Sequence, residues 1–160
     1  KEFADIFDCE SIFGYQNLID RKDITALYIP LPTGLHKEWI IKALNAGKHV
    51  YVEKSIAFNY EDAYEMVNLA RLKGLSLMEG YMFIYHAQHQ LTLDIITSGE
   101  IGEIRTFRSS FGFPPLESGN FRYEKDLGGG VIFDAAGYPL RAVHLFLGSD
   151  LKVTSSSLKN

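Results

Sequence analysis

The first half of the chain alternates between short apolar runs and longer stretches with apolar residues at helical spacing. The run at 26–29 is nearly continuous and is followed by Pro30, which predicts a buried parallel strand and the loop that leaves it. A helical face then begins at His36, and Gly47 stands where a left-handed C-terminal cap is expected. The apolar residues of that face are Trp39, Ile40, Ala43 and Leu44.

The same cycle continues toward Gly80. Residues 49–52 predict a second strand, Asn59 is the expected N-cap of a second helix that stops at Gly74, and 76–79 predict a third strand. Strands and helices that alternate at this spacing imply right-handed crossovers and a parallel sheet. Ligands of such sheets bind outside the carboxyl ends of the strands, so the residues of interest should follow each strand directly.

The pattern changes after Gly80, where a second domain is expected to begin. The elements predicted there are a helix at about 86–98, a strand at 104–113, a polar loop to 126, a helix at about 136–147 and a strand at 152–157. Before the first strand, residues up to about 21 predict two short helical pieces with a turn at Gly14. The pattern thus favours an α/β chain whose two parts divide near residue 80.

Composition narrows the class of protein. The 160 residues are 46% hydrophobic and 22% charged, as in ordinary globular domains. A net charge of −4 with dispersed Lys and Arg argues against nucleic acid or a membrane surface as partner. Cys9 is the only cysteine, and no apolar run is long enough to cross a bilayer. We therefore expect a soluble protein of a reducing compartment, with the cytoplasm as the default.

The charged pair Glu53-Lys54 directly follows the second predicted strand. An ammonium at that position can hydrogen-bond a substrate hydroxyl or carbonyl and can lower the pKa of a neighbouring acid. A plain surface ion pair, with Lys54 extended into solvent, fits the same position. Position alone leaves both interpretations open.

Three longer segments resemble the Gfo/Idh/MocA oxidoreductase family. They are Tyr-Ile-Pro-Leu-Pro-Thr-Gly-Leu-His at 28–36, Ala-Gly-Lys-His-Val-Tyr-Val-Glu-Lys at 46–54, and Leu-Gly-Gly-Gly-Val-Ile-Phe-Asp-Ala-Ala-Gly-Tyr at 127–138. The turn at 98–104 is similar to that family's hinge into its substrate domain. The resemblance implies the C-terminal half of a Rossmann-like domain at 1–80, then the start of an α+β substrate domain with a largely antiparallel sheet at 81–160.

The resemblance also implies a cofactor, NAD or NADP, and roles for individual residues. The cofactor-binding residues would be Pro30, Leu31, Thr33, His36, Glu53 and Lys54. The catalytic residues would be Lys54, Tyr138 and Asp134, and the substrate would contact Lys54, His86, Arg122 and Tyr138. The implied partners are a small sugar or sugar-nucleotide substrate and further copies of the chain, joined through the sheet of the second domain.

Two positions depart from the common family pattern. Ser55 stands where the family usually has proline, which leaves the backbone after Lys54 less constrained. Tyr138 stands where many members have histidine, although subgroups that act on nucleotide-linked keto-sugars, on glucose and fructose, or on dihydrodiols resemble this chain in having tyrosine. A phenol near a cationic lysine can protonate the alkoxide that follows hydride transfer, so Tyr138 is the expected general acid or base.

Several of these residues have simpler interpretations. Tyr138 could be a helix-start tyrosine packed in a wall, and Asp134 could cap the helix that follows. Arg122 could contact a cofactor or sugar phosphate, or be a solvated loop residue, and Arg141 has the same ambiguity. Residues 128–130 lack the Lys-Ser/Thr of a phosphate cradle, so close backbone packing is the better explanation for these glycines.

His86 and His89 lie on one predicted helix face and could supply half of a zinc site. No convincing third and fourth ligand is near them in the sequence, so no metal is expected. A metal-dependent hydrolase at these two residues is therefore the weaker enzyme hypothesis.

The expected activity is hydride transfer between NAD(P)(H) and a hydroxyl or keto carbon of a sugar or sugar nucleotide. The Gly-x-Gly-x-x-Gly fingerprint that binds the pyrophosphate is absent from the sequence, so we expect a fragment that begins near the third helix of a dinucleotide-binding domain. This absence and the serine at position 55 favour an alternative hypothesis, in which the protein is a non-catalytic relative that only binds a ligand or partner.

Overall fold

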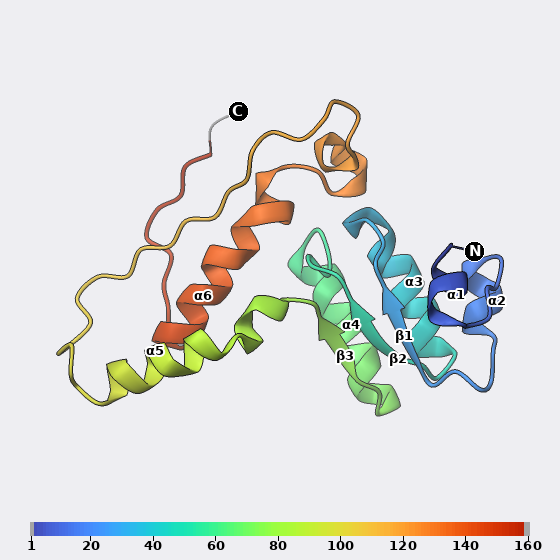
Figure 1. Ribbon diagram of the computed structural model, residues 1–160, viewed down its shortest axis with the longest axis horizontal. Coiled ribbons are helices and arrows are strands. Elements are labelled where there is room, and N and C mark those ends of the chain that lie inside the picture. Colours follow the sequence, from blue (N-terminus) through green and yellow to red (C-terminus); the bar gives the residue numbers. More distant parts are fainter. Residues whose placement is uncertain (1, 159–160) are drawn as a thin grey trace. The chain divides into compact units, whose positions relative to one another are not determined.

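The alternation of strand and helix produces a parallel sheet in the first half of the chain. The structure is a computed structural model that describes residues 2–158, with side chains from Phe3 onward. In it, β1 (Ala26–Ile29), β2 (His49–Val52) and β3 (Leu77–Glu79) pair in parallel in that order. Helix α3 (Thr33–Asn45) connects β1 to β2, and α4 (Tyr60–Lys73) connects β2 to β3 (Figure 1). The predicted α/β fold with a parallel sheet is confirmed.

One face of this sheet forms the hydrophobic core with α3 and α4. Successive strand residues point to opposite faces, so every second residue enters the core. The core consists of Ile19, Leu27, Ile29, Ile40, Ala43, Leu44, Val50, Val52, Met66 and Ala70. On the alternate strand positions, Tyr28 is 55% exposed and its ring stacks on Tyr51 at 5.2 Å between ring centroids. The apolar run of β1 is therefore buried on one face only among the described residues.

The helix ends follow the predicted chemistry. At the start of α4, Asn59 Oδ1 accepts a hydrogen bond of 2.8 Å from the Asp62 N–H. At its end, Gly74 takes the left-handed conformation with φ of 65°. Helix α3 begins at Thr33, three residues before the predicted start, and Gly47 follows its end with φ of 77°. These stops set where β2 and β3 begin.

The chain forms two compact units. The first contains the residues up to Gly80 together with Asp126–Gly128, and the second contains Tyr81–Lys125 and the residues from Gly129 onward. The first unit also holds two short helices, α1 (Glu2–Phe7) and α2 (Tyr15–Ile19). Across residues 2–158, no helix is both long and apolar enough to cross a membrane.

The elements of regular secondary structure in the described part of the second unit are helices. Its elements are η1 (Met82–Tyr85), α5 (Ala87–Thr97), η2 (Phe121–Tyr123), the π-helical turn η4 (Ile132–Ala136) and α6 (Gly137–Leu147), and η3 (Lys125–Leu127) lies where the two units meet in the sequence. The predicted helices at 86–98 and 136–147 are thus present as α5 and α6.

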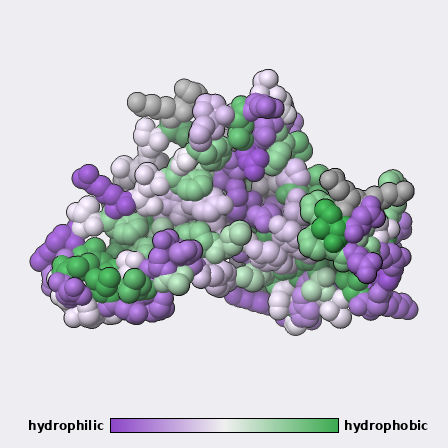
Figure 2. All heavy atoms as spheres, in the orientation of Figure 1, coloured by the Kyte–Doolittle hydropathy of each residue, from purple (hydrophilic) through white to green (hydrophobic). Residues whose placement is uncertain are grey.

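The prediction of strands at 104–113 and 152–157 is wrong, because neither segment forms a strand among the described residues. A strand exists only when its backbone pairs with a partner, and β-forming residues alone do not supply one. From residue 81 to 158, Ala135 is the one residue classed as buried, and apolar side chains such as Phe113 and Val153 remain exposed. Figure 2 shows hydrophobic patches on the face of the molecule that is in view. The expected antiparallel sheet is therefore absent from the described residues.

The burial of Met66 predicts a large loss of stability on truncation. Its side chain is completely buried on α4, so Met66→Ala should lower the free energy of unfolding by about 2–5 kcal/mol in urea denaturation. Leu72→Ala is the matched control, since Leu72 lies on the same helix and is 86% exposed; a change below about 0.5 kcal/mol is expected. Equal losses in the two variants would contradict this core.

Candidate active site

The carboxyl ends of the three strands are aligned in the first unit. Ile29 pairs with Val52, and Val52 pairs with Glu79, so the chain leaves each strand at the same edge. The Glu53 N–H donates to the Ile29 carbonyl at 3.1 Å, which extends the ladder one residue beyond β2. Of the residues predicted to bind the cofactor, Pro30 and Leu31 lie in the loop after β1, Thr33 and His36 in the first turn of α3, and Glu53 and Lys54 directly after β2.

A tyrosine on β1 holds the carboxylate of Glu53. The Tyr28 hydroxyl donates a hydrogen bond of 2.7 Å to Glu53 Oε1. This hydrogen bond, with smaller effects of desolvation and of the negative charge, raises the pKa of Tyr28 to about 12. Glu53 is thus fixed at the strand end by the neighbouring strand.

The raised pKa of Tyr28 gives a test of this contact. The interaction favours the protonated phenol, so its contribution to stability is present below the ordinary pKa of 10.0 and is lost as the pH rises toward 12. Glu53→Ala should bring the pKa of Tyr28 down toward 10.0, because it removes the carboxylate that accepts the hydrogen bond and carries the negative charge. Titration of ¹³C-labelled tyrosine by NMR measures this, with Tyr28→Phe to assign the signal. A Tyr28 that titrates at the same pH with and without the Glu53 carboxylate would contradict the contact.

The segment after Lys54 is held from two other elements. The fully buried ring of His36 on α3 has its Nδ1 2.8 Å from the Ser55 carbonyl oxygen and its Nε2 2.6 Å from that of Leu31. The Ile56 N–H donates to Glu79 Oε1 at 2.7 Å. Lys54 itself is partly buried, and its peptide bond to Ser55 is cis. The backbone on the C-terminal side of Lys54 is therefore anchored to α3 and to β3.

The glycine-rich segment packs against the start of α3. A Cβ placed on Gly34 would lie 2.5 Å from the Asp126 carbonyl oxygen, and one on Gly128 would lie 2.7 Å from Thr33 Cβ. Gly128 also has φ of 90°, which other residues rarely adopt. Close backbone packing, which the sequence favoured over a phosphate cradle, is what the structure shows for Gly128.

Tyr138 lies at the second residue of α6 among aromatic rings of the second unit. Its ring stacks on Phe111 at 4.3 Å between ring centroids, and the rings of Tyr81 and Phe83 lie at 5.6 Å. Aromatic neighbours on several sides fix the orientation of the ring. The side chain is partly buried, and its ring is packed among other side chains as in a purely structural role. The same packing is compatible with a catalytic role of the hydroxyl.

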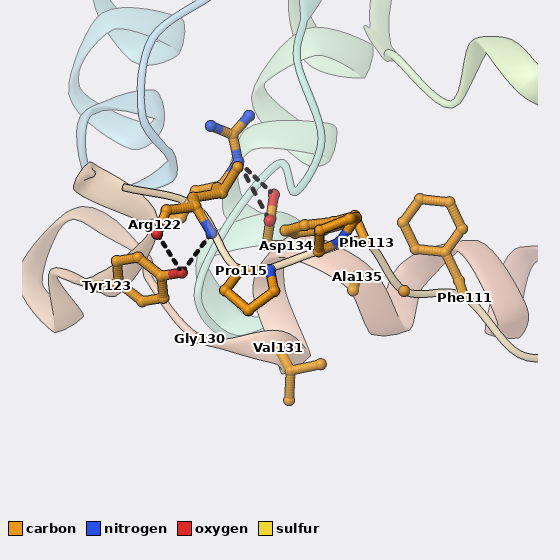
Figure 3. A pocket seen from close by; sticks show the side chains of 12 residues that line it. Phe111, Phe113, Pro115, Arg122, Tyr123, Gly130, Val131, Asp134 and Ala135 are labelled. Carbon is orange, nitrogen blue, oxygen red and sulfur yellow. Dashed lines mark hydrogen bonds and ion pairs between the residues drawn. The ribbon is translucent and has the colours of Figure 1, made fainter. Parts of the chain in front are cut away.

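Arg122 and Asp134 form an ion pair beside a cavity in the second unit. Arg122 Nε lies 3.2 Å from the Asp134 carboxylate, whose side chain is only 13% exposed (Figure 3). Both residues line a cavity of about 510 Å³ with Phe111, Phe113, Pro115 and Val131, among others. The guanidinium also lies over the ring of Phe121, 4.7 Å from its centroid. The interpretation of Asp134 as the cap of α6 is wrong, because Ala136 is the N-cap residue, no side chain caps this helix, and Asp134 lies within η4.

His86 is the N-cap of α5. Its Nδ1 accepts a hydrogen bond of 3.2 Å from the Gln88 N–H, and the His89 ring lies against Phe83 and Phe146. Within the part of the chain that the structure describes, no group of three or more His, Cys, Asp or Glu residues is placed to hold a metal ion. Arg141 lines a smaller cavity of about 270 Å³ with Ile84, His144 and Leu145.

Sequence reasoning did not find three residues that shape these sites. Tyr28 bonds to Glu53, and Glu79 bonds to the Ile56 N–H. Tyr28 and Glu79 are polar residues at or next to the carboxyl end of a strand, and this position is the sequence signal that indicates them. Phe111 packs on Tyr138 from a segment without regular structure, and no local pattern indicates that contact.

Comparison with known proteins places both units in one family. Residues 1–81 match the model of the oxidoreductase family with an NAD-binding Rossmann fold, and residues 89–160 match the GFO/IDH/MocA C-terminal domain. Among curated proteins, dTDP-3,4-didehydro-2,6-dideoxy-alpha-D-glucose 3-reductases are similar. The one from Saccharopolyspora spinosa is 47% identical over 98% of this chain and 47% of its own length, and the one from Actinomadura kijaniata is 45% identical over 100% and 48%.

A solved structure is similar as well. A 3-ketoreductase from Actinomadura kijaniata, crystallised in complex with NADP and TDP-benzene, has a TM-score of 0.91 and 46% identity, over 94% of this chain and 46% of its own. The chain spans about half the length of the curated relatives it matches. With both of its units matched by models of one family, the chain belongs to the Gfo/Idh/MocA oxidoreductases.

Proposed function

We propose that the protein is an NADP-dependent reductase of a nucleotide-linked keto-sugar. The observation that carries this proposal is the high identity, over nearly the whole chain, to two reductases whose names specify a dTDP-linked didehydro sugar. The similar structure that holds NADP and TDP-benzene supports the same cofactor and a thymidine diphosphate group in the substrate.

The first unit fits the nicotinamide end of such a cofactor. Three parallel strands end at one edge, which is where nucleotides bind in this class of sheet. Residues Pro30, Leu31, Thr33, Glu53 and Lys54 would hold that part of the cofactor. When bound, it supplies the hydride. The Gly-x-Gly-x-x-Gly fingerprint, which holds the pyrophosphate, is not in this sequence.

Tyr138 and Lys54 carry the proton chemistry in the proposed reaction. As the hydride reaches the carbonyl carbon, the Tyr138 hydroxyl gives its proton to the carbonyl oxygen, so the ketone becomes a secondary alcohol. The Lys54 ammonium orients that oxygen and stabilises the negative charge that develops on it. The aromatic packing of Tyr138 limits its motion, which favours one geometry for the transfer.

The remaining predicted residues are assigned to substrate positioning. Arg122 lines the cavity of the second unit, and its planar guanidinium would donate hydrogen bonds to the diphosphate of the substrate. Asp134 holds the guanidinium by its ion pair and belongs to the catalytic segment, and His86 would hydrogen-bond the sugar. Lys54 also contacts the sugar in this proposal.

The proposal also covers the domains, the cellular compartment and the oligomeric state of the enzyme. Residues 1–80 are assigned as part of the dinucleotide-binding domain and 81–160 as part of the substrate domain, and the protein is assigned to the cytoplasm as a homo-oligomer joined through the second domain. A single cysteine, Cys9, supports the reducing compartment. The many exposed apolar residues of the second unit, including Leu91, Ile101 and Val153, support an interface there.

The direct test is turnover with the protein at its full natural length. With NADPH and dTDP-3,4-didehydro-2,6-dideoxy-α-D-glucose, nicotinamide absorbance should decay while the reduced sugar nucleotide appears, and NADH should react more slowly. A fluorescence titration with both cofactors accompanies it. Failure of both cofactors to bind would overturn the proposal in favour of a non-catalytic relative.

A further inference from the structure

His36 is a buried histidine whose two ring nitrogens both face backbone carbonyls. Its side chain has no exposed surface, with Nδ1 at 2.8 Å from the Ser55 oxygen and Nε2 at 2.6 Å from the Leu31 oxygen. The polar atoms of the ring are therefore directed at the protein itself. This arrangement differs from the expectation that the side chain contacts the cofactor.

The chemistry of the two partners restricts what the ring can do. A carbonyl oxygen only accepts hydrogen bonds, so each of these contacts requires a proton on the facing nitrogen. A neutral imidazole carries one N–H and can satisfy one carbonyl at a time, whereas the doubly protonated ring satisfies both. A buried carbonyl oxygen without a hydrogen-bond donor costs free energy, so the loss of either contact with the ring is unfavourable.

The two carbonyls belong to different strand-end segments. Leu31 lies in the loop that leaves β1, and Ser55 directly follows Lys54 at the end of β2. Because the ring is packed in the core at one end of α3, it links the two loops through a rigid element. Movement of either loop would break the contact between its carbonyl oxygen and the ring.

From this geometry we propose that His36 is a positioning residue that couples the cofactor loop to the catalytic lysine. The inference rests on the proposed function of Lys54 and of the loop at Leu31. One ring nitrogen fixes the Ser55 carbonyl and so sets the backbone from which Lys54 projects. The other fixes the Leu31 carbonyl and so sets the surface offered to the nicotinamide end of the cofactor.

Two amide substitutions separate the two hydrogen bonds. In His36→Asn the side-chain amide nitrogen takes the place of Nδ1 and can still donate to Ser55, while the donor to Leu31 is lost. In His36→Gln the amide nitrogen takes the place of Nε2 and can still donate to Leu31, while the donor to Ser55 is lost. Each variant keeps a donor toward one carbonyl and leaves the other carbonyl without one, so the two should be destabilised to a similar extent.

The proposal predicts opposite kinetic effects of these variants. His36→Gln should lower kcat by about tenfold or more with little change in the KM for NADPH, because a misplaced catalytic group slows the chemical step. His36→Asn should mainly raise the KM for NADPH and have the smaller effect on kcat. Ile40→Val, one turn further along the same buried face, is the control for a small loss of core packing. Equal effects of the two amide variants on kcat and on KM would overturn the proposal.

A readout without substrate or cofactor keeps this test independent of the proposed function. Amide hydrogen exchange of the peptide that covers 53–58 should be faster in His36→Gln than in His36→Asn, and the reverse should hold for the peptide that covers 30–33. The same exchange rates in both variants would contradict the link even if the wild-type protein reduced no sugar. Absence of turnover with the expected exchange pattern would instead reject the proposed function and keep the link.

Discussion

Replacing Tyr138 by phenylalanine is expected to lower kcat by about 10²–10⁴-fold, because the variant lacks the hydroxyl that protonates the carbonyl oxygen. The ring contacts with Phe111, Tyr81 and Phe83 are made by the aromatic ring, which phenylalanine keeps. The fold and the affinity for NADPH should therefore stay close to those of the wild type. Single-turnover rates measure the chemical step, and a nicotinamide fluorescence titration measures binding.

Tyr85→Phe is the matched control for this change. Tyr85 lies in η1 of the same unit and is 68% exposed, so removal of its hydroxyl should leave the turnover rate unaltered. If Tyr138→Phe turned over at the wild-type rate, the tyrosine would be a packed wall residue and the proton would come from another group. If both variants lost activity together, a general disturbance of the second unit would explain the result.

Replacing Lys54 by methionine should lower kcat by about 10²–10³-fold, the range found when one donor to a developing oxyanion is removed. Methionine keeps an unbranched, flexible side chain of similar reach but has no charge, so the packing of the partly buried stem is largely retained. The segments around it remain held by Tyr28, His36 and Glu79. Steady-state kinetics with a saturating cofactor measure the loss.

The control for Lys54 is Lys42→Met on α3. Lys42 forms an exposed ion pair of 2.6 Å with Glu38, a contact of small energetic value. Its replacement should change neither kcat nor the affinity for NADPH. A Lys54→Met variant as active as Lys42→Met would show that Lys54 is a surface residue, which was the simpler interpretation of the Glu53-Lys54 pair.

The fold of the first unit could be predicted because its signals are local. Asn59 and Gly74 bound α4 through contacts within four residues, and the apolar runs that form the strands are each short and distinct. The segment at 104–113 has the same kind of local signal, yet it forms no strand among the described residues. Local propensity indicates which residues favour a strand, but pairing depends on residues far away in sequence.

The site was predicted in part for the same reason. The position of Glu53 and Lys54 could be predicted, because the residues after a parallel strand lie at a known edge of the sheet, whereas their role stays a prediction. The contacts of His36 with Leu31 and Ser55 depend on how two loops pass the same ring, which no spacing reveals. Asp134 was expected to act as a catalytic group or a cap, and its ion pair with Arg122, twelve residues earlier, follows from the path of the intervening loop.

Transfer of deuterium from the cofactor to the sugar tests the central claim most directly. NADPH that carries deuterium on C4 of the nicotinamide, on the face from which the hydride leaves, is incubated with the full-length protein and the dTDP-linked didehydro sugar. The account predicts one deuterium bound to C3 in the product, as located by NMR, with loss of the signal in Tyr138→Phe on the same time scale. A reduced product without deuterium, or NADPH that binds while the ketone stays intact, would contradict it.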